Sequence, residues 1–401
     1  MNGRFINKIN ALHLFISGTF FFKIIESTVS FIPPIYKLYL PATLFIGFYI
    51  AYPYLRKIQG SISVSIFLIS LFSYFIILLN VLCSDYVDLN GVTPLDFHLV
   101  LLFSIPAFFM YGISISRSTS FNLEENNIDR SVVFLLALVI FLNVNFQYFR
   151  LDFESFKYDK AVYLFLGDIL SIIGLYYVSI AKGTLNKAIY FSLFLLLLFV
   201  VYSRTSLYFF AFTVFAGIFI SSSGRRKICY LLPVVFFALI IISLSETLSH
   251  MELPYSLNRM LFVFSGSDDG SLNGREMIFE GSLRSLENSL LLGDFGNQID
   301  VFGYWSFYIH NVLSYLRQFG LIAFIFVIIM LLLPLIFFTY RVHVGRRLSI
   351  SPLYMFGFLV SFYLLCIYVF SRSYMYPYIY LMPGYFIGVV CSEKKLYLTN
   401  R

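Results

Sequence analysis

Charged residues are scarce in this chain: they make up 12% of its 401 residues, whereas hydrophobic residues make up 59%. A soluble globular protein carries about 25% charged residues, so this chain has too few to cover a water-facing surface. Together with a mean hydropathy of +0.84, this scarcity excludes secreted, cytosolic and disordered proteins. The apolar stretches are long runs rather than alternating patterns, which excludes an outer-membrane barrel. The composition therefore predicts an all-α polytopic membrane protein.

The sequence also lacks the short motifs that mark common metal and nucleotide sites. It has no HExxH motif, no Walker loop and no Rossmann fingerprint. Its four cysteines have no metal-ligand spacing and are expected to be small packing residues. The basic residues are dispersed rather than arranged in a stripe, which gives no support for nucleic-acid binding. We therefore expect no metal, no cofactor and no nucleic-acid partner.

Twelve stretches are candidates for transmembrane helices, each of which needs about 20 apolar residues. The first is the weakest, because Lys23 and Glu26 interrupt it. The predicted spans are residues 9–30, 35–55, 61–83, 97–116, 131–148, 161–181, 188–203, 205–223, 228–245, 319–340, 352–370 and 376–392. Together they predict a single integral membrane domain, residues 1–401.

The distribution of basic residues predicts that both termini lie in the cytoplasm. With this orientation, the cytoplasmic segments contain 17 of the 28 lysines and arginines, the outer segments contain 10, and Lys23 lies within the first span. Every cytoplasmic segment then carries at least two basic residues, as the positive-inside rule requires. An even number of spans preserves this pattern, whereas removing one span would invert every later loop.

One external loop, residues 246–318 between the ninth and tenth spans, is far longer than the others. Within it, residues 275–291 predict an amphipathic helix, because apolar side chains recur at intervals of four, three and four positions between Phe279 and Leu290. Asn273 is expected to cap the start of this helix, and Gly293 is expected to end it.

Arg204 lies in a short Ser203-Arg204-Thr205-Ser206 turn between two spans at the outer surface. Such a turn places backbone donors beside a guanidinium, and both are good partners for a phosphate group. The alternative is an arginine that extends from a helix end to the lipid headgroups.

Two arginines belong to the predicted loop helix. Arg275 follows Gly274 at its expected start, where free N–H groups and the helix dipole favour an anion. The alternative is a solvated residue that pairs with a nearby carboxylate. Arg284 lies about 180° further round the helix, and surface ion pairs with Glu280 and Glu287 are the stronger explanation for it.

His310 opens the segment HNVLSYLRQFGLIAF before the tenth span. If the helix extends back through this segment, His310, Ser314 and Arg317 lie on one stripe. A histidine and an arginine at this position suit phosphoryl binding or proton transfer near neutral pH. The alternative is an interfacial histidine that faces water.

Two further charged residues lie near the last spans or within a span. Arg372, in the turn SRSYMYPY, is a candidate for sugar contact at the outer surface, and a role in topology is the simpler alternative. Asp168 lies inside the sixth span, where a carboxylate is costly. It is either a functional group or a structural hydrogen-bonding group.

Several short motifs follow one another in the second half of the chain. An SRTS turn follows a mid-chain helix, GRE and LLGDFG occur in the long loop, and HNVLSYLRQFGLIAF opens the next helix. This arrangement resembles the O-antigen polymerase and O-antigen ligase superfamily of bacterial surface-polysaccharide enzymes. The resemblance covers roughly residues 202–340, together with the topology of the whole chain.

The resemblance implies a GT-C-like membrane architecture in the bacterial inner membrane. It also implies a glycosyltransferase that uses neither a metal nor a nucleotide sugar, and whose donor is a glycan on undecaprenyl diphosphate at the periplasmic face. The superfamily's SRT arginine corresponds to Arg204, its Gly-Arg loop motif to Gly274 and Arg275, and its His-Asn helix start to His310 and Asn311.

We therefore expect Arg204, Arg275 and His310 to be catalytic. In this reaction, cations meet the diphosphate leaving group, where negative charge grows as the glycosidic bond breaks. The acceptor sugar hydroxyl attacks the anomeric carbon. The residues expected to bind substrate are Ser203, Thr205, Arg284, Asn311, Arg317 and Arg372.

Within the superfamily that the chain resembles, strong aromaticity and divergent motifs are usual for O-antigen polymerases, so the resemblance favours a polymerase, whose acceptor is a lipid-linked repeat unit. One alternative is an O-antigen ligase, which transfers the glycan to lipid A core. Another is a flippase or transporter of lipid-linked oligosaccharide. The expected partners are the undecaprenyl-diphosphate-linked oligosaccharide, the lipid bilayer and a chain-length regulator protein.

Overall fold

The structure is a computed structural model, and it describes residues 11–28, 35–56, 58, 60–121, 127–145, 150–151, 162–222, 270–284, 290–345 and 351–399. Helices dominate these residues. The strands among them, β1 (Val144–Asn145) and β2 (Arg150–Leu151), are two residues each and pair antiparallel.

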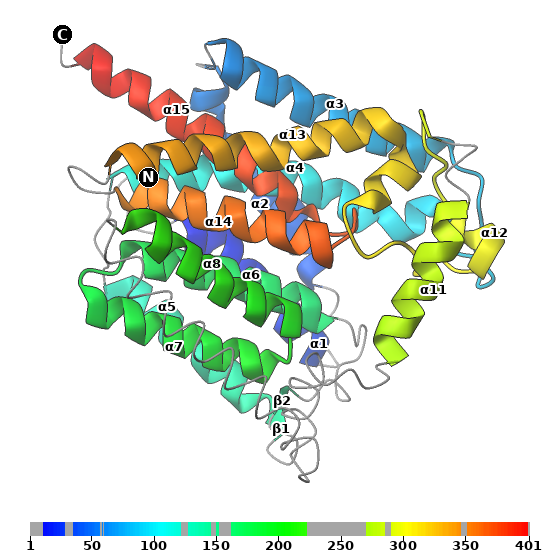
Figure 1. Cartoon of the computed structure of the whole chain (residues 1–401), viewed down its shortest axis with the longest axis horizontal. Coiled ribbons are helices and arrows are strands. Elements are labelled where there is room, and N and C mark those ends of the chain that lie inside the picture. Colours follow the sequence, from blue (N-terminus) through cyan, green and yellow to red (C-terminus); the bar gives the residue numbers. More distant parts are fainter. Residues whose placement is uncertain are drawn as a thin grey trace.

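The long helices run side by side in one bundle (Figure 1). The helices are η1 (His13–Ser17), α1 (Gly18–Thr28), α2 (Ile35–Leu55), α3 (Ser61–Cys83), α4 (Pro94–Phe121), α5 (Asn127–Leu142), α6 (Val162–Ile180), α7 (Thr184–Val201), α8 (Arg204–Ser221), α11 (Gly270–Arg284), α12 (Gln298–Phe302), α13 (Leu313–Gly345), α14 (Pro352–Phe370), η3 (Pro377–Tyr380) and α15 (Leu381–Thr399). Within the described segments, eight are long and apolar enough to cross a membrane, namely α2, α3, α4, α6, α7, α8, α13 and α14. The chain therefore has the helices of a multi-pass membrane protein.

These eight helices coincide with eight of the twelve predicted spans. The first, fifth and last predicted spans correspond to shorter apolar helices, His13–Ile25, Arg130–Leu142 and Pro377–Ser392. The ninth, residues 228–245, lies outside the described residues. The total of twelve spans and the periplasmic position of residues 246–318 therefore stay predictions.

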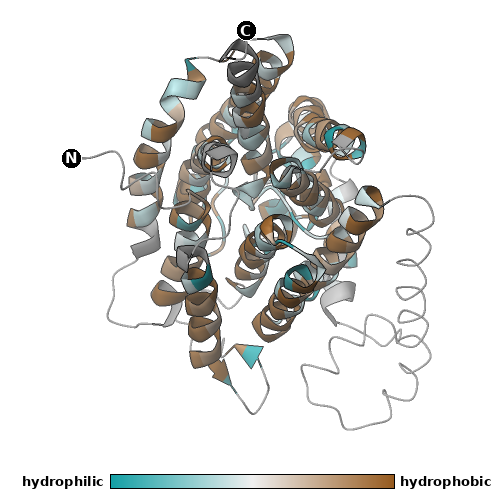
Figure 2. Ribbon diagram, turned by 90° about the vertical axis from the view of Figure 1, so that its left-hand side faces the viewer, coloured by the Kyte–Doolittle hydropathy of each residue, from teal (hydrophilic) through white to brown (hydrophobic). Residues whose placement is uncertain are grey.

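Three helices form the centre of the bundle. Within an 18-residue apolar stretch of each helix, 83% of the residues are buried in α6, 72% in α4 and 67% in α14, compared with 22–33% in the other five long helices. A helix that is apolar all round and buried is a core helix, whereas the less buried helices have apolar faces for lipid. Figure 2 shows apolar residues on most faces of the long helices.

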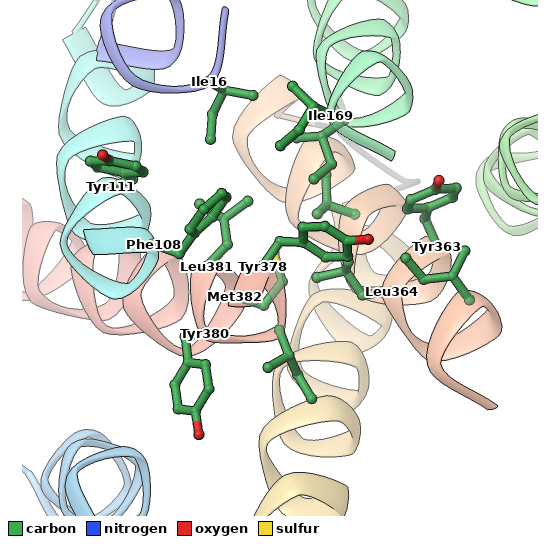
Figure 3. Close-up of a cluster of buried hydrophobic side chains, with 14 of the residues drawn as sticks. Ile16, Phe108, Tyr111, Ile169, Tyr363, Leu364, Tyr378, Tyr380, Leu381 and Met382 are labelled. Carbon is green, nitrogen blue, oxygen red and sulfur yellow. The ribbon is translucent and has the colours of Figure 1, made fainter. Parts of the chain in front are cut away.

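The helix α15 packs closely along α4 because glycines lie at the contact. A Cβ at Gly112 would be 2.0 Å from the carbonyl oxygen of Leu381, and one at Gly384 would be 2.0 Å from that of Phe109. Figure 3 shows part of the adjoining core, where Phe108 of α4, Ile169 of α6, Leu364 of α14 and Met382 of α15 come together. This core positions the turns at one end of the bundle.

The predicted loop helix exists but starts and ends elsewhere. Helix α11 begins at Gly270, so Asn273 lies within its first turn and does not cap its start. Residues 290–292 form a turn, so the described helix does not run to 291. Gly293 does adopt the left-handed conformation, with φ 78°. Helices α11 and α12 lie at one end of the bundle, beside the start of α13 (Figure 1).

Helix α13 begins at Leu313 rather than extending back through His310. The Asn311 side chain accepts a hydrogen bond from the Leu313 N–H at 2.9 Å, which satisfies a free donor at the helix start. The helix is interrupted at Gly320, where φ is 79°. A Cβ there would be 2.3 Å from the Leu291 carbonyl oxygen, so the interruption admits the incoming chain.

Candidate functional site

The Ser203–Ser206 turn joins two helices with almost no intervening chain. Helix α7 ends at Val201, Tyr202 adopts the left-handed conformation with φ 65°, and α8 begins at Arg204. The left-handed residue ends the first helix, as is common at a helix C-terminus. Arg204 is therefore the first helical residue of α8, and it is half-buried.

A second turn, Ser371–Ser373, lies against the first one. The Ser371 hydroxyl donates to the Thr205 hydroxyl oxygen at 3.3 Å. Helix α6 approaches the same place, because a Cβ at Gly167 would be 2.4 Å from the Cβ of Ser203. Both serine–arginine turns therefore meet beside Asp168, the next residue of α6.

Asp168 and Arg372 form an ion pair inside the protein. Arg372 donates from Nε to Oδ2 at 2.5 Å and from Nη2 to Oδ1 at 3.0 Å, so it binds both carboxylate oxygens. Neither side chain is exposed. Burial by itself lowers the pKa of Arg372, but Asp168 together with Tyr378 and Tyr376 outweighs burial and raises this pKa above its usual range. Arg372 is thus a charged group whose charge is neutralised internally.

Three hydroxyl groups complete the surroundings of the Asp168 carboxylate. Ser206 donates to Oδ1 at 2.7 Å, Tyr363 donates to Oδ1 at 2.8 Å, and Tyr378 donates to Oδ2. Figure 3 shows Tyr363 and Tyr378 reaching the core from α14 and η3. The carboxylate therefore ties α6, α8, α14 and the turn before α15 together.

These contacts give three predicted substrate-binding residues a different environment from the one expected from the sequence. Arg372 is fully buried, not at the outer surface where its sequence position suggested sugar contact. Ser203 is also fully buried, and its hydroxyl is 2.6 Å from that of Ser206. Thr205 faces the second turn, through Ser371.

Arg317 lies fully buried near the start of α13. Its Nη1 donates to Ser282 of α11 at 2.5 Å, and its Nη2 donates to the side-chain oxygen of Asn297 at 3.1 Å. Among the described residues, no carboxylate forms an ion pair with it, and its Nε has no hydrogen-bond partner. Arg317 therefore holds α11 and the segment before α12 to the bundle, while no described carboxylate pairs with its positive charge.

An aromatic cluster with unpaired polar atoms adjoins Arg317. The ring of Phe295 lies 5.0 Å from that of His98 and 6.2 Å from that of Tyr374, measured between centroids. Both ring nitrogens of His98 and the hydroxyl of Tyr374 are buried without a partner in the described part of the protein. Neither residue was predicted from the sequence. A single histidine within an apolar helix, such as His98, carries no spacing signal.

His310 and Arg317 lie at the same end of the bundle, although not on one helical stripe. His310 is half-buried in the bend before α13, with its ring 5.1 Å from that of Tyr308. Tyr308 lies 5.6 Å from Tyr374, whose backbone N–H donates to the Ser314 hydroxyl at 2.9 Å. A series of contacts through Tyr308, Tyr374 and the start of α13 thus links His310 with the helix that carries Arg317.

Arg275 and Arg284 both lie on α11, whose backbone is described at these positions. Arg275 is the sixth residue of the helix, not a residue at its first turn as the sequence suggested. Its predicted use of the helix N-terminus is therefore wrong. The side chains of both arginines lie outside the described residues, as does Glu287, the predicted partner of Arg284.

The fold defines an all-α, multi-pass membrane protein with a cluster of polar turns at one end of its bundle. Within the described residues, no group of three or more histidines, cysteines, aspartates or glutamates is arranged to hold a metal ion. A comparison with models of known protein families finds no match, and a comparison with curated protein sequences finds none either.

Proposed function

We propose that this protein is a membrane glycosyltransferase of the O-antigen polymerase type. It transfers a glycan from undecaprenyl diphosphate to a lipid-linked repeat unit at the periplasmic face of the bacterial inner membrane. The order of the short motifs from the SRTS turn to the His-Asn segment supports the proposal. No cofactor takes part in it.

The observation that carries the proposal is the position of Arg204. This half-buried arginine is the first residue of α8, where backbone N–H groups at a helix start favour an anion. Its turn is fixed by the Ser206 hydroxyl, which donates to Asp168 and accepts from Arg372. A guanidinium held in place at a helix start is suited to a diphosphate leaving group.

The reaction needs few protein groups. The acceptor hydroxyl oxygen forms a bond to the anomeric carbon of the donor, and the bond from that carbon to the diphosphate oxygen breaks. Negative charge grows on the diphosphate, where Arg204 and Arg275 stabilise it. His310 accepts the acceptor proton, since an imidazole titrates near neutral pH.

Arg317 and Arg372 have different roles in this proposal. Arg372 is already neutralised by Asp168, so it positions the turn that carries Arg204. Arg317 has no carboxylate partner among the described residues, so its field adds to the positive potential at this end of the bundle.

The test is complementation of a deletion strain with single-site variants. Arg204→Ala and Arg275→Ala should leave the protein in the membrane but give lipopolysaccharide with only a single repeat unit. Lys187→Ala, an exposed residue on α7, is the control and should restore the normal ladder. Normal long-chain product from both arginine variants would refute the proposal.

The deletion strain distinguishes the polymerase from the alternatives. One repeat unit on core is the polymerase phenotype. Rough core with stored lipid-linked polymer would instead assign a ligase. Movement of a labelled lipid-linked unit across proteoliposomes without chain growth would assign a transporter.

A further inference from the structure

A pocket of about 510 Å³ opens at the end of the bundle that carries α11 and α12. It lies between the end of α3 and the segment that leads into α12. The residues that line it are Asn80, Cys83, Ser84, Asp85, Tyr86, Gly293, Asp294 and Phe295. Of these residues, only Phe295 belongs to the candidate site described above, as part of the aromatic cluster beside Arg317.

Hydrogen bonds hold the two walls of the pocket together. Ser84 donates to the Phe295 carbonyl oxygen at 3.0 Å, and Tyr86 donates to Asp294 Oδ1 at 3.4 Å. Gly296 adopts φ 100°, and a Cβ there would be 2.6 Å from the Tyr86 ring. The two walls are therefore joined where they meet.

The chemistry of the lining suits a hydroxyl-rich ligand. Asp85 and Asp294 offer carboxylate oxygens that accept hydrogen bonds, Tyr86 has a phenol, and Phe295 offers an apolar surface. Burial, Asp294 and Asp300 raise the pKa of Tyr86 to about 12, so its hydroxyl stays protonated at neutral pH. Among the described residues, no lysine, arginine or histidine lines the pocket, so this lining does not suit a phosphate.

The inner wall of the pocket leads toward the candidate site. Asn297 donates to Asp294 Oδ2 at 2.7 Å and accepts from Arg317. Behind Phe295 lie His98 and Tyr374, whose buried polar atoms have no partner among the described residues. The Phe295 ring thus has Asp294 and Asn297 beside it and His98 and Tyr374 behind it. Through these residues the pocket adjoins the region of Arg317 and His310.

We propose that this pocket is a saccharide subsite that binds an uncharged, hydroxyl-rich sugar of the acceptor repeat unit. Asp85 and Asp294 accept hydrogen bonds from sugar hydroxyls, and the Tyr86 and Phe295 side chains contact the apolar face of the ring. The volume is within the range of about 300–1,000 Å³ that is common for small-molecule sites. The identity of the sugar as an acceptor rests on the proposed function, whereas the binding itself does not.

Cys83 provides a direct probe, because it lines the pocket and is exposed. The test uses the full-length protein in lipid nanodiscs, with Cys229, Cys366 and Cys391 replaced by alanine. The rate of Cys83 alkylation by a maleimide is measured against increasing amounts of the repeat-unit oligosaccharide released from the source strain's surface polysaccharide by mild acid. At ten times the Kd, labelling should slow about elevenfold, since only the free protein reacts.

Asp85→Asn and Asp294→Asn in the same background should remove this protection. Glu276→Gln, an exposed carboxylate on α11 outside the pocket, is the matched control and should keep it. The inference is wrong if the oligosaccharide gives no protection, if both aspartate variants remain protected, or if Mg²⁺ or Ca²⁺ alone protects equally.

Failure of this inference and failure of the proposed function give different results. Labelling needs no transfer reaction, so protection with normal long chains in Arg204→Ala and Arg275→Ala would leave the saccharide site standing and refute the polymerase. Loss of chain growth in both variants without any protection of Cys83 would refute the subsite and leave the polymerase standing.

Discussion

Replacing Asp168 with asparagine should destabilise this protein more than a typical core substitution. The variant keeps the shape of the side chain but removes the charge that neutralises Arg372, and both residues are fully buried. An asparagine also turns an NH₂ group toward donors that now contact carboxylate oxygens, such as Tyr378. Removing one partner of a buried ion pair costs about 3–5 kcal/mol. We expect Asp168→Asn to fall in that range.

The assay is reversible unfolding in mixed micelles, followed by the fluorescence of Trp305. This is the single tryptophan of the chain, and it is buried at the same end of the bundle. The double variant Asp168→Asn/Arg372→Gln removes both charges, so its loss should be smaller than the sum of the single losses by about 1–3 kcal/mol. Glu276→Gln, which removes an exposed carboxylate, should change stability by less than about 0.5 kcal/mol. Losses below 1 kcal/mol for Asp168→Asn, or strict additivity in the double variant, would refute the reasoning.

Four further measurements examine other parts of the structure. Ser206→Ala removes a donor to Asp168 and should lower the free energy of unfolding by about 1–2 kcal/mol in the same assay, with shorter polysaccharide chains at equal protein level. Arg317→Gln removes the guanidinium that binds Ser282, so amide exchange in α11 should become faster, and unchanged exchange would contradict this tie. Gly112→Ala should destabilise by about 1–3 kcal/mol, because a Cβ there overlaps the Leu381 carbonyl, whereas Gly274→Ala has open space within a helix and should be neutral or stabilising. EDTA should leave polymerisation in membrane vesicles unchanged, and lost activity that Mg²⁺ restores would argue against a metal-independent reaction.

The positions of the long helices could be predicted from the sequence because they depend on local composition. Each of the eight long helices is an apolar run. In such a helix the backbone N–H and C=O groups bond to each other, whatever the helix packs against. The start of α13 could not be predicted in the same way. It depends on the Asn311 cap and on the break at Gly320, where the chain from Leu291 approaches the helix backbone.

The candidate site was only partly predictable for a related reason. Asp168 could be singled out, because a carboxylate within a span is costly unless it has a partner. Its partner Arg372 is 204 residues away, and no periodicity joins the two positions. The predicted start of α11 was wrong, since the helix begins at Gly270. The bond between Ser282 of α11 and Arg317 was not predictable either, because the two residues belong to different parts of the chain.

The pairing of Asp168 changes how the few charges of this chain should be interpreted. An arginine at the outer end of a span looks like a ligand-binding group when only its position is known. Arg372 is neutralised by a buried carboxylate, so its charge no longer attracts a distant anion. Its role is therefore structural. Because Arg372 binds the same carboxylate as Ser206, the ion pair sets the position of the turn that carries Arg204. The scarce internal carboxylate thus fixes the turn from which α8 begins at Arg204.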